Sequence, residues 1–428
     1  MVRPGNALAL AAVLLLRRHV LRAAAQEDLR GVLQRAADGM AAKYNMSVAI
    51  AAHSPRFRAA AAAGFIDAGL GLGAPARRAS PDDAYVWGST TKMFTAPAVL
   101  QLVERGAVRL TDPVSEHTDA ILSHLGGRTL AAHFGEGIRH VQVQHVLRMQ
   151  SGIPDYDNGN YTMDQFRERS RAFGPVEIMF KYVSPRLEFH PGSQTRYCST
   201  NYVLLGLLLA QHYHKNGTGW SWEAYDQAAI FPAALRKAFP QSKFVTAGPC
   251  KLHTPVHGFM ESYPGVSLPS QDVWDVSCVG GWTAGNYVGP VAEVASFTHA
   301  LYNKQAPGVV SAASQKLLTN FTGFPGMPKF YGMGTFSLDW SVGGAEAYGH
   351  VGDTYGYQSQ TTYFPGLDFV LSVATNVETT TQAQPADATC VAYNALVAAW
   401  SGAAAPSCEF KVFGRFLGRC LCSTLLVV

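Results

Sequence analysis

The sequence is poor in charged residues and has no concentrated basic segment. Only 15% of its 428 residues are charged, the net charge is +4, and no run of five or more Lys or Arg occurs. Because nucleic-acid-binding proteins carry a basic patch or stripe, this composition gives no support to a nucleic-acid partner. No stretch of 18 apolar residues occurs, so we expect no membrane-spanning helix. With 48% hydrophobic residues, the chain can bury a large core as a soluble globular protein.

Cysteine is also scarce, with seven in the chain. Two pairs lie close together in the sequence and are candidate disulfides in an oxidising compartment, although spacing alone does not fix the pairing. These pairs are Cys250 with Cys278, and Cys390 with Cys408. The odd number leaves one thiol over, which we expect in the tail at Cys420-Leu-Cys422. Two cysteines without a second cluster or a histidine pair are poor evidence for a metal site, so we predict no metal and no cofactor.

The first 25 residues read as a targeting peptide. An apolar run at 7–16 precedes the small residues Ala23–Ala25, which is typical of a secretory signal cleaved after Ala25. Arginines at 17, 18 and 22 also suit a mitochondrial presequence. Glycosylation sequons favour the secretory alternative, and we predict a secreted or secretory-lumen protein, with the mitochondrion as the alternative. The sequons begin at Asn45, Asn160, Asn216 and Asn320.

The hydrophobic pattern predicts an α/β protein whose sheet comes from both ends of the chain. An early helix and two strands precede a turn-rich helical middle, and four short β-rich runs and a last helix follow. The predicted ranges are 27–44 (helix), 46–53 and 58–65 (strands), 90–105 (helix), 332–340, 346–353, 357–365 and 368–376 (strands), and 386–400 (helix). We therefore expect a central antiparallel sheet flanked by helices over residues 27–410, with a mainly helical insertion at about 111–265. The basic tail 411–428 ends in an apolar run too short for a membrane anchor.

The segment VWGSTTKMF at 86–94 places Ser89 three residues before Lys92, at the start of a predicted helix. Serine is a common helix N-cap, and that structural interpretation is sufficient for an isolated Ser-x-x-Lys. The same spacing puts both side chains on one face of a helix. A lysine in that position can act as the base that a serine hydroxyl needs to become a nucleophile. Ser89 is therefore either a cap or a nucleophile, and other segments must decide.

Two further segments carry chemistry-bearing residues in a suggestive order. Tyr197 and Ser199 precede an apolar helical run, and a tyrosine there is usable as a proton shuttle if a nearby cation lowers its pKa. His350 and Gly352 lie on a glycine-rich predicted strand, where glycine indicates the close approach of another backbone or a ligand. Taken alone, each has a structural explanation, namely a packed tyrosine and a satisfied histidine at a sheet edge.

The three segments in this order resemble the serine β-lactamase and penicillin-binding-protein superfamily, closest to the class C-type branch that includes esterases and D-aminopeptidases. Enzymes of that superfamily carry their serine nucleophile in a Ser-x-x-Lys motif. The resemblance runs over most of residues 45–400 and includes HVLRMQSGIPDY (145–156), RYCSTNYVLLG (196–206), GHVGDTYGY (349–357) and TTYFPGLDFVLSVATN (361–376).

The resemblance implies a role for each matching residue. Ser89 would form an acyl-enzyme, Lys92 would lower the pKa of Ser89 and Tyr197, and Tyr197 would shuttle the proton. The backbone N–H groups of Ser89 and Asp353 would form the oxyanion hole. The residues implied in substrate binding are Ser199, His350 and Gly352.

The sequence departs from the family pattern at three positions. Ser199 stands where the family has the Asn of Tyr-x-Asn, which shortens or removes a carboxamide hydrogen bond. His350 replaces the Lys of Lys-Thr-Gly, and the loss of a fixed positive charge disfavours a carboxylate-bearing β-lactam. Pro97 lies inside the helix that follows Ser89, where it removes a backbone hydrogen bond.

We therefore predict a serine hydrolase acting on a small-molecule ester or peptide, with carboxylesterase ranked first, a D-amino-acid-specific peptidase second and a β-lactamase third. The alternative is a catalytically inactive relative that serves as a binding or assembly protein, since folds are reused without their chemistry. A Lys92 far from Ser89 would favour that alternative. No feature of the sequence indicates the natural substrate or the oligomeric state.

Overall fold

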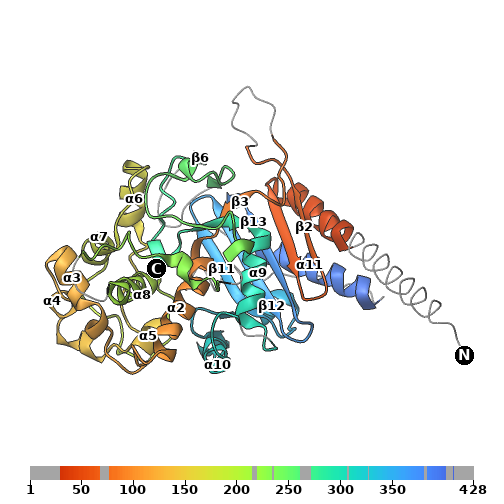
Figure 1. Cartoon of the computed structure of the whole chain (residues 1–428). Helices are drawn as coiled ribbons and strands as arrows, with labels where there is room; N and C mark the ends of the chain where they lie inside the picture. The colour runs from red at the N-terminus through yellow and green to blue at the C-terminus, as the bar shows by residue number, and fades with distance from the viewer. Residues whose placement is uncertain are drawn as a thin grey trace, which may run out of the picture.

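The computed structural model describes residues 29–401 and 408, apart from 68–76, 215–218, 234–235, 261–270, 306–307, 326 and 380–382. The predicted targeting peptide, the tail with its two cysteines, and Asn216 lie outside the described residues. Within them, the sheet is antiparallel and mixed with helices, as predicted (Figure 1).

The main sheet has eight strands in the order β2-β1-β13-β12-β11-β10-β9-β8. Its strands are β1 (Val48–His53), β2 (Arg58–Ala63), β8 (Thr322–Phe324), β9 (Met327–Tyr331), β10 (Phe336–Ser337), β11 (Tyr348–Thr354), β12 (Tyr357–Phe364) and β13 (Phe369–Thr375). Strand β1 pairs with β13, and Val48 lies opposite Thr375. The prediction that both chain ends build one sheet is therefore confirmed.

Two small sheets accompany the main one, in the orders β14-β5-β6 and β3-β7-β4. Their strands are β3 (Ala84–Val86), β4 (Lys243–Phe244), β5 (Phe259–Met260), β6 (Gln271–Asp272), β7 (Tyr287–Pro290) and β14 (Val377–Glu378). The α-helices are α2 (Lys92–Glu104), α3 (Asp119–Gly126), α4 (Leu130–Phe134), α5 (Val143–Leu147), α6 (Gly159–Arg167), α7 (Pro175–Glu177), α8 (Ser199–Tyr213), α9 (Val291–Tyr302), α10 (Ala312–Leu318) and α11 (Gln384–Ser401).

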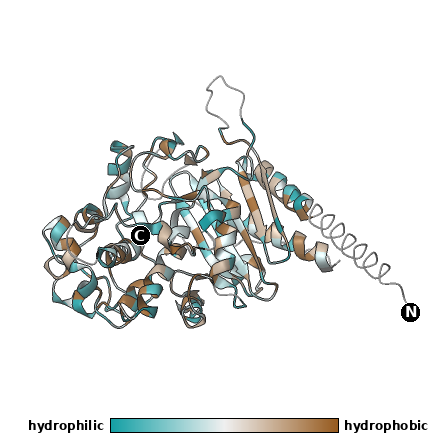
Figure 2. Ribbon diagram, viewed as in Figure 1, coloured by the Kyte–Doolittle hydropathy of each residue, from teal (hydrophilic) through white to brown (hydrophobic). Residues whose placement is uncertain are grey.

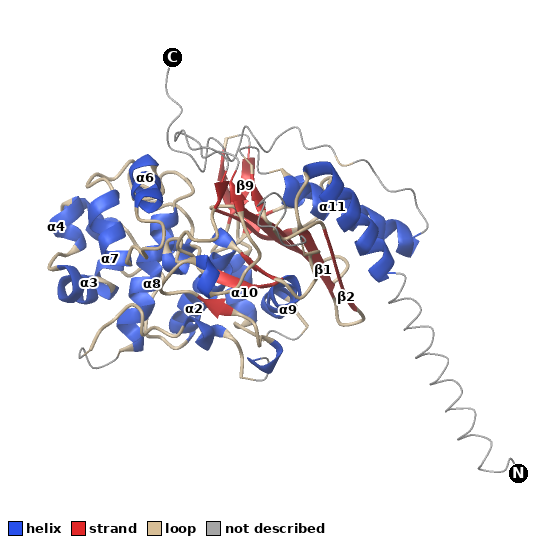
Figure 3. Cartoon of the chain, turned by 90° about the horizontal axis from the view of Figure 1, so that it is seen from above, coloured by secondary structure: helices blue, strands red, loops and turns tan. Residues whose placement is uncertain are grey.

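Helices cover both faces of the main sheet (Figure 3). Helix α9 packs against β1, β12 and β13, and α11 packs against β12 and β13 from the other side. Residues 29–44 are also helical, and Asp387 of α11 holds this helix through an ion pair with Lys43 and a hydrogen bond from Tyr44. Helices α3–α8 gather to one side of the sheet (Figure 1), and all fall within residues 111–265. In the described part of the chain, no helix is both long and apolar enough to span a bilayer.

Hydrophobic residues concentrate in the strands and in the helices packed on them, whereas hydrophilic residues are frequent in the outlying turns of the helical part (Figure 2). Strand β13 is wholly buried and mostly apolar. Strand β12 is also buried throughout, although five of its eight residues are Gln, Ser or Thr. Thr361 shows how this is tolerated, because its hydroxyl bonds Thr298 of α9 at 2.9 Å and Ser372 of β13 at 2.6 Å. Buried polar groups with partners keep the free-energy cost of burial low.

Two secondary-structure predictions need correction. The run at 332–340 is not one strand, because Gly334 has φ +67° and turns the chain between β9 and β10, and residues 339–342 form a 3₁₀ turn. Pro97 does not break its helix, since α2 runs through it with Pro97 buried. The lost backbone hydrogen bond is offset by burial on nearly every side of α2, which makes tertiary packing the main support of that helix.

Both candidate disulfides are present, Cys250–Cys278 and Cys390–Cys408. Among the described cysteines the unpaired one is Cys198, which is buried. The sequence analysis expected the unpaired thiol in the C-terminal tail and did not predict one at Cys198, between Tyr197 and Ser199.

Candidate active site

Ser89 lies in a tight turn, Gly88–Thr91, immediately before α2. The turn depends on Gly88, whose φ is +50° and whose missing Cβ would lie 2.5 Å from the backbone oxygen of Asp353. Thr91 closes the turn by donating to the Gly88 carbonyl at 2.7 Å. Glycine therefore allows both the left-handed backbone and the close approach of β11. Ser89 and the backbone of Asp353, the two predicted oxyanion-hole positions, lie side by side.

Lys92 is fully buried, and its amine points at Ser89. The Nζ atom lies 2.8 Å from Ser89 Oγ, 3.3 Å from Ser199 Oγ and 3.0 Å from the carbonyl oxygen of Ala284. An ammonium group has three donors, and these three acceptors match them. Burial lowers the pKa of Lys92 to about 7, against the opposing effect of the carboxylates of Asp155 and Asp157. At neutral pH a large fraction of Lys92 is thus the free amine, which is the form able to take a proton.

Tyr197 is buried beside this pair, with Lys92 Nζ 5.0 Å from its ring centroid. Its ring stacks on Phe336 at a centroid distance of 5.4 Å. Burial raises the pKa of Tyr197 well above its usual value, and the neighbouring Ser89 hydroxyl only partly opposes this. The expectation that Lys92 lowers the pKa of Tyr197 is therefore wrong. Burial is the largest influence on the pKa of Tyr197, and it outweighs the hydrogen bond to Ser89.

Ser199 takes the place that the family gives to an asparagine, at the first residue of α8. Its hydroxyl keeps the contact with Lys92, and its backbone N–H donates to Asp155 at 2.9 Å. A carboxylate at a helix N-terminus is favourable for unpaired N–H groups and for the helix dipole. Asn201 faces elsewhere, because it accepts a hydrogen bond from Ser151 at 2.7 Å.

His350 and Gly352 lie behind the reacting groups rather than at an open surface. Both ring nitrogens of His350 have partners, the Tyr331 hydroxyl at 2.9 Å from Nε2 and the Val351 carbonyl at Nδ1. Burial holds the pKa of His350 well below its usual value, so its ring is neutral. A Cβ on Gly352 would lie 1.9 Å from the Trp87 carbonyl. Gly352 thus lets β11 pack against the turn that carries the serine, and His350 is tied to Tyr331 of β9. Neither residue lies in the lining of the cavity described below.

A cavity of about 40 Å³ opens over Ser89. Two predicted residues, Ser199 and Asp353, share this lining with Ser89. The remaining lining residues are Tyr156, Asp157, Tyr161, Gly280, Ala284, Gly285, Thr354 and Tyr355. The resemblance implied that the segment 278–290 borders the cleft, and Gly280, Ala284 and Gly285 lie in it. The other lining residues were not identified, because they come from separate loops and a helix and share no spacing. The one available signal was that Thr354 and Tyr355 directly follow the predicted site residue Asp353 in the sequence.

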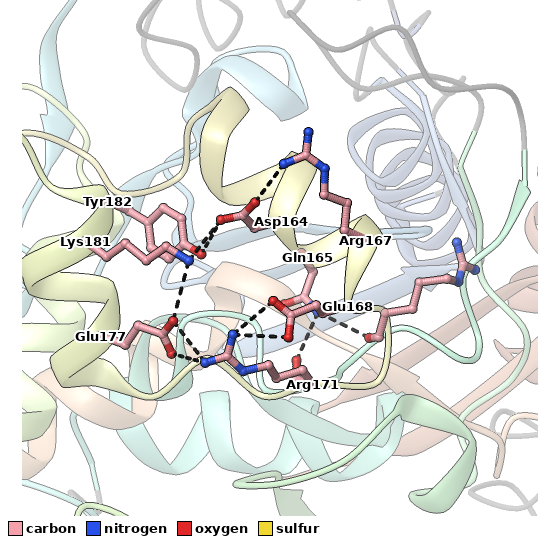
Figure 4. Close-up of polar contacts among 9 residues, drawn as sticks. Asp164, Gln165, Arg167, Glu168, Arg171, Glu177, Lys181 and Tyr182 are labelled. Carbon is pink, nitrogen blue, oxygen red and sulfur yellow. Dashed lines mark hydrogen bonds and ion pairs between the residues drawn. The ribbon is translucent and has the colours of Figure 1, made fainter.

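Helix α6 contributes Tyr161 to the cavity lining. On the side away from the cavity, a network of charged residues stabilises the position of α6 (Figure 4). Asp164 of α6 pairs with Lys181 at 3.0 Å and accepts a hydrogen bond from Tyr182 at 2.9 Å. Arg171 pairs with Glu177 at 2.8 Å. The ring of Tyr182 in turn packs edge-on against Tyr161 at 5.2 Å. These contacts hold Tyr161 in the wall next to Ser89.

A comparison with protein-family models matches the description "Beta-lactamase" over residues 33–395. This range covers most of the chain and includes the serine turn, Tyr197 and β11. The chain belongs to the beta-lactamase family. The resemblance read from the motifs is confirmed, and the sheet flanked by helices is the fold of this family.

Three similar proteins share 21–27% sequence identity with this chain. Protein flp of Staphylococcus aureus (strain NCTC 8325 / PS 47) is 25% identical over 201 residues, 46% of this chain, and the chain spans only 36% of that protein's length. Penicillin-binding protein 4 of Amycolatopsis lactamdurans is 27% identical over 305 residues, 69% of this chain and 72% of that protein. A D-stereospecific amidohydrolase from Streptomyces sp. has a similar fold, with a TM-score of 0.66 at 21% identity, covering 88% of this chain and 99% of that one. Together with the family match, these similarities support a serine hydrolase.

Proposed function

We propose that the protein is a serine hydrolase that cleaves a small ester or amide through an acyl-enzyme on Ser89. The observation that carries the proposal is the 2.8 Å contact between Lys92 Nζ and Ser89 Oγ in a buried setting where the lysine pKa is about 7. A base is most effective when its pKa lies near the working pH. The same contact argues against a catalytically inactive binding protein, because that alternative was expected to have Lys92 far from Ser89.

The roles follow from the positions of the groups. Lys92 takes the proton as Ser89 Oγ bonds to the acyl carbon, and Tyr197, whose pKa keeps it a phenol, passes a proton to the leaving oxygen or nitrogen. The N–H groups of Ser89 and Asp353 stabilise the negative oxygen of the tetrahedral intermediate. Water then attacks the acyl-enzyme by the reverse proton route and frees Ser89.

Ester and amide substrates are both within this chemistry. Similarity in fold to an amidohydrolase supports including amides, although the proposal does not depend on it. The neutral His350 offers no fixed charge to a substrate carboxylate, which supports ranking β-lactams last.

A serine-directed fluorophosphonate tests the nucleophile directly. We expect one equivalent to add to the purified protein and the mass shift to map to the peptide that contains Ser89. The Ser89→Ala variant should gain no mass, and Ser115→Ala, which alters a buried serine outside the cavity lining, should still be labelled. Unlabelled wild-type protein, or label on another serine, would contradict the proposal and favour the inactive binding protein.

We also propose that the chain enters the secretory pathway, which its two disulfides support. The asparagines of three sequons are exposed, which an oligosaccharide acceptor requires: Asn45, Asn160 and Asn320. Protein expressed in a eukaryotic host should therefore lose mass on treatment with peptide-N-glycosidase. An unchanged mass, with the protein recovered from mitochondria, would support the presequence alternative.

A further inference from the structure

Trp282 adopts a backbone conformation that a bulky residue rarely takes. Its φ is +52°, in the left-handed region, and it follows Gly280 and Gly281, whose φ values are +39° and +73°. Glycine adopts this region freely, whereas a bulky side chain is an outlier there. Such a conformation persists only where the surrounding structure enforces it, and strained residues of this kind gather at functional sites. Gly280 lines the cavity over Ser89, so the strained residue lies two positions from the site.

The indole ring of Trp282 is fixed by its surroundings. The ring is fully buried and packs edge to face against Trp222 and Tyr225, at centroid distances of 5.4 and 6.3 Å. Helix α8 lies against it as well, since a Cβ on Gly206 would lie 2.7 Å from Trp282 Cζ3. The buried Nε1 has no hydrogen-bond partner in the part of the chain that the structure describes, which is unusual for a buried donor. A role in core packing would explain the burial, but not the left-handed backbone.

The backbone of Trp282 closes the turn that presents Ala284 to Lys92. The carbonyl oxygen of Trp282 accepts the N–H groups of Gly285 and Asn286, each at 2.9 Å. This turn encloses Ala284, whose own carbonyl oxygen lies 3.0 Å from Lys92 Nζ. The position of that carbonyl therefore depends on the conformation at Trp282.

The Ala284 carbonyl determines how the free amine of Lys92 is oriented. A carbonyl oxygen can only accept, so one N–H of the amine must point at Ala284. A neutral amine has two N–H groups and one lone pair. With the second N–H directed at Ser199 Oγ, 3.3 Å away, the lone pair faces Ser89 Oγ at 2.8 Å. This is the orientation in which a base can take the serine proton.

From this geometry we propose that Trp282 is a positioning residue, whose packed ring and left-handed backbone hold the Ala284 carbonyl against the amine of Lys92. The amine then presents its lone pair to Ser89. This inference rests on the proposed function. Trp282 is not among the residues that line the cavity, so it acts through Lys92 and not on the substrate.

Trp282→Leu tests this role, because leucine leaves the backbone strained and removes the ring that holds it. The turn can then relax, and we expect kcat for p-nitrophenyl propionate to fall by at least about tenfold with KM little changed, since a displacement of about 1 Å can cost about 100-fold. Trp282→Phe keeps a ring in the same place and loses no hydrogen bond to the described residues, so it should retain most of kcat. Trp340→Leu is the matched control, because Trp340 lies in the 3₁₀ turn 339–342, outside the cavity lining, and should keep the wild-type kcat.

The pH profile separates positioning from a general loosening of the fold. A carbonyl acceptor binds a charged ammonium more strongly than a neutral amine. Its loss in Trp282→Leu should therefore move the midpoint of the rise in kcat/KM to a lower pH than in the wild-type protein. Entry of water would have the opposite effect, because burial is what lowers the pKa of Lys92. The carboxylates of Asp155 and Asp157 and the thiol of Cys198 raise the same pKa, and the substitution leaves all three groups in place.

Gly206→Ala displaces the same turn without removing the ring, so it remains decisive if Trp282→Leu folds poorly. The added Cβ would lie 2.1 Å from Thr283 Oγ1 and 2.7 Å from Trp282 Cζ3, on the α8 side of the turn. We expect kcat and the midpoint to fall as in Trp282→Leu. Gly39→Ala, in the helical segment 29–44, should change neither, because its Cβ meets no other atom within 4 Å.

Three results would decide against the proposal or its basis. Wild-type kcat in a folded Trp282→Leu, or a loss of kcat with an unchanged or higher midpoint, would overturn it and leave Trp282 a structural residue. Equal losses in Trp282→Phe and Trp282→Leu would also overturn it, since the ring would then not be what holds the turn. Ester hydrolysis by the wild-type protein no faster than that of Ser89→Ala would instead be a failure of the proposed function itself.

Discussion

Ser89→Ala and Lys92→Met are each expected to lower kcat for p-nitrophenyl propionate by about four orders of magnitude, and the double variant by no more than either alone. The reason is that the two residues act as one unit, with their reacting atoms 2.8 Å apart. A serine without its base is a weak nucleophile, and a base without its nucleophile has no proton to take. The release of p-nitrophenol by the four proteins measures this directly.

Lys329→Met is the matched control, because Lys329 is exposed on β9 and its replacement should leave kcat unchanged. Losses that add up in the double variant would show that Ser89 and Lys92 act in separate steps.

The same lysine sets the expected pH dependence. Its pKa of about 7 means that the amine is neutral and active above that pH and protonated below it, so kcat/KM should rise with pH through about 7. The ester substrate does not titrate, and the rate of Ser89→Ala provides the background. A flat profile from about pH 5.5 to 8.5 would remove Lys92 from the role of base.

Gly352→Ala is expected to lower kcat/KM by at least about 100-fold, since displacements of about 1 Å at a reacting group cost that much. The added Cβ would lie 1.9 Å from the Trp87 carbonyl and 2.3 Å from Ser359 Oγ. The Trp87 carbonyl cannot move away without carrying Gly88 and Ser89 with it. Overpacking of this kind also costs roughly 1–3 kcal/mol of the free energy of unfolding. Urea unfolding and steady-state kinetics on one preparation separate the two effects.

Gly39→Ala serves as the control for this substitution. It lies in the helical segment 29–44, and an added Cβ there meets no other atom within 4 Å. It should leave kcat/KM unchanged and stabilise the protein slightly, because alanine is the better helix former. Wild-type turnover by Gly352→Ala would mean that the packing of β11 on the serine turn is not required for activity.

Much of the scaffold was predictable from the sequence because its signals are local. Strands such as β13 are apolar runs bounded by turns, and Gly352 was identified as a point of close backbone approach. The Ser-x-x-Lys pair was predictable for the same reason, since a helical turn fixes its geometry. The turn at Gly334 was not predictable from the sequence. A glycine with a left-handed backbone inside an apolar run does not change the hydrophobic periodicity.

The environment of the site was less predictable than its central pair. The pKa of Tyr197 depends on complete burial among Phe336 and other side chains far away in the sequence. The wall residues Asp157, Tyr161 and Tyr355 are brought together only by tertiary structure. His350 was expected to face the substrate by its motif, and its contacts with Tyr331 and Val351 became visible only in three dimensions.

The pairing of β1 with β13 has a consequence for biosynthesis. A ribosome delivers the reactive serine long before it delivers Asp353 or the strand that pairs with Val48. Until β13 is synthesised, the edge of β1 that pairs with it has no partner strand. Unpaired strand edges of this kind are prone to aggregation. A chain cut short before β13 would carry the serine without an assembled sheet. The serine turn and the complete sheet around it therefore come together only after the chain has been synthesised through β13.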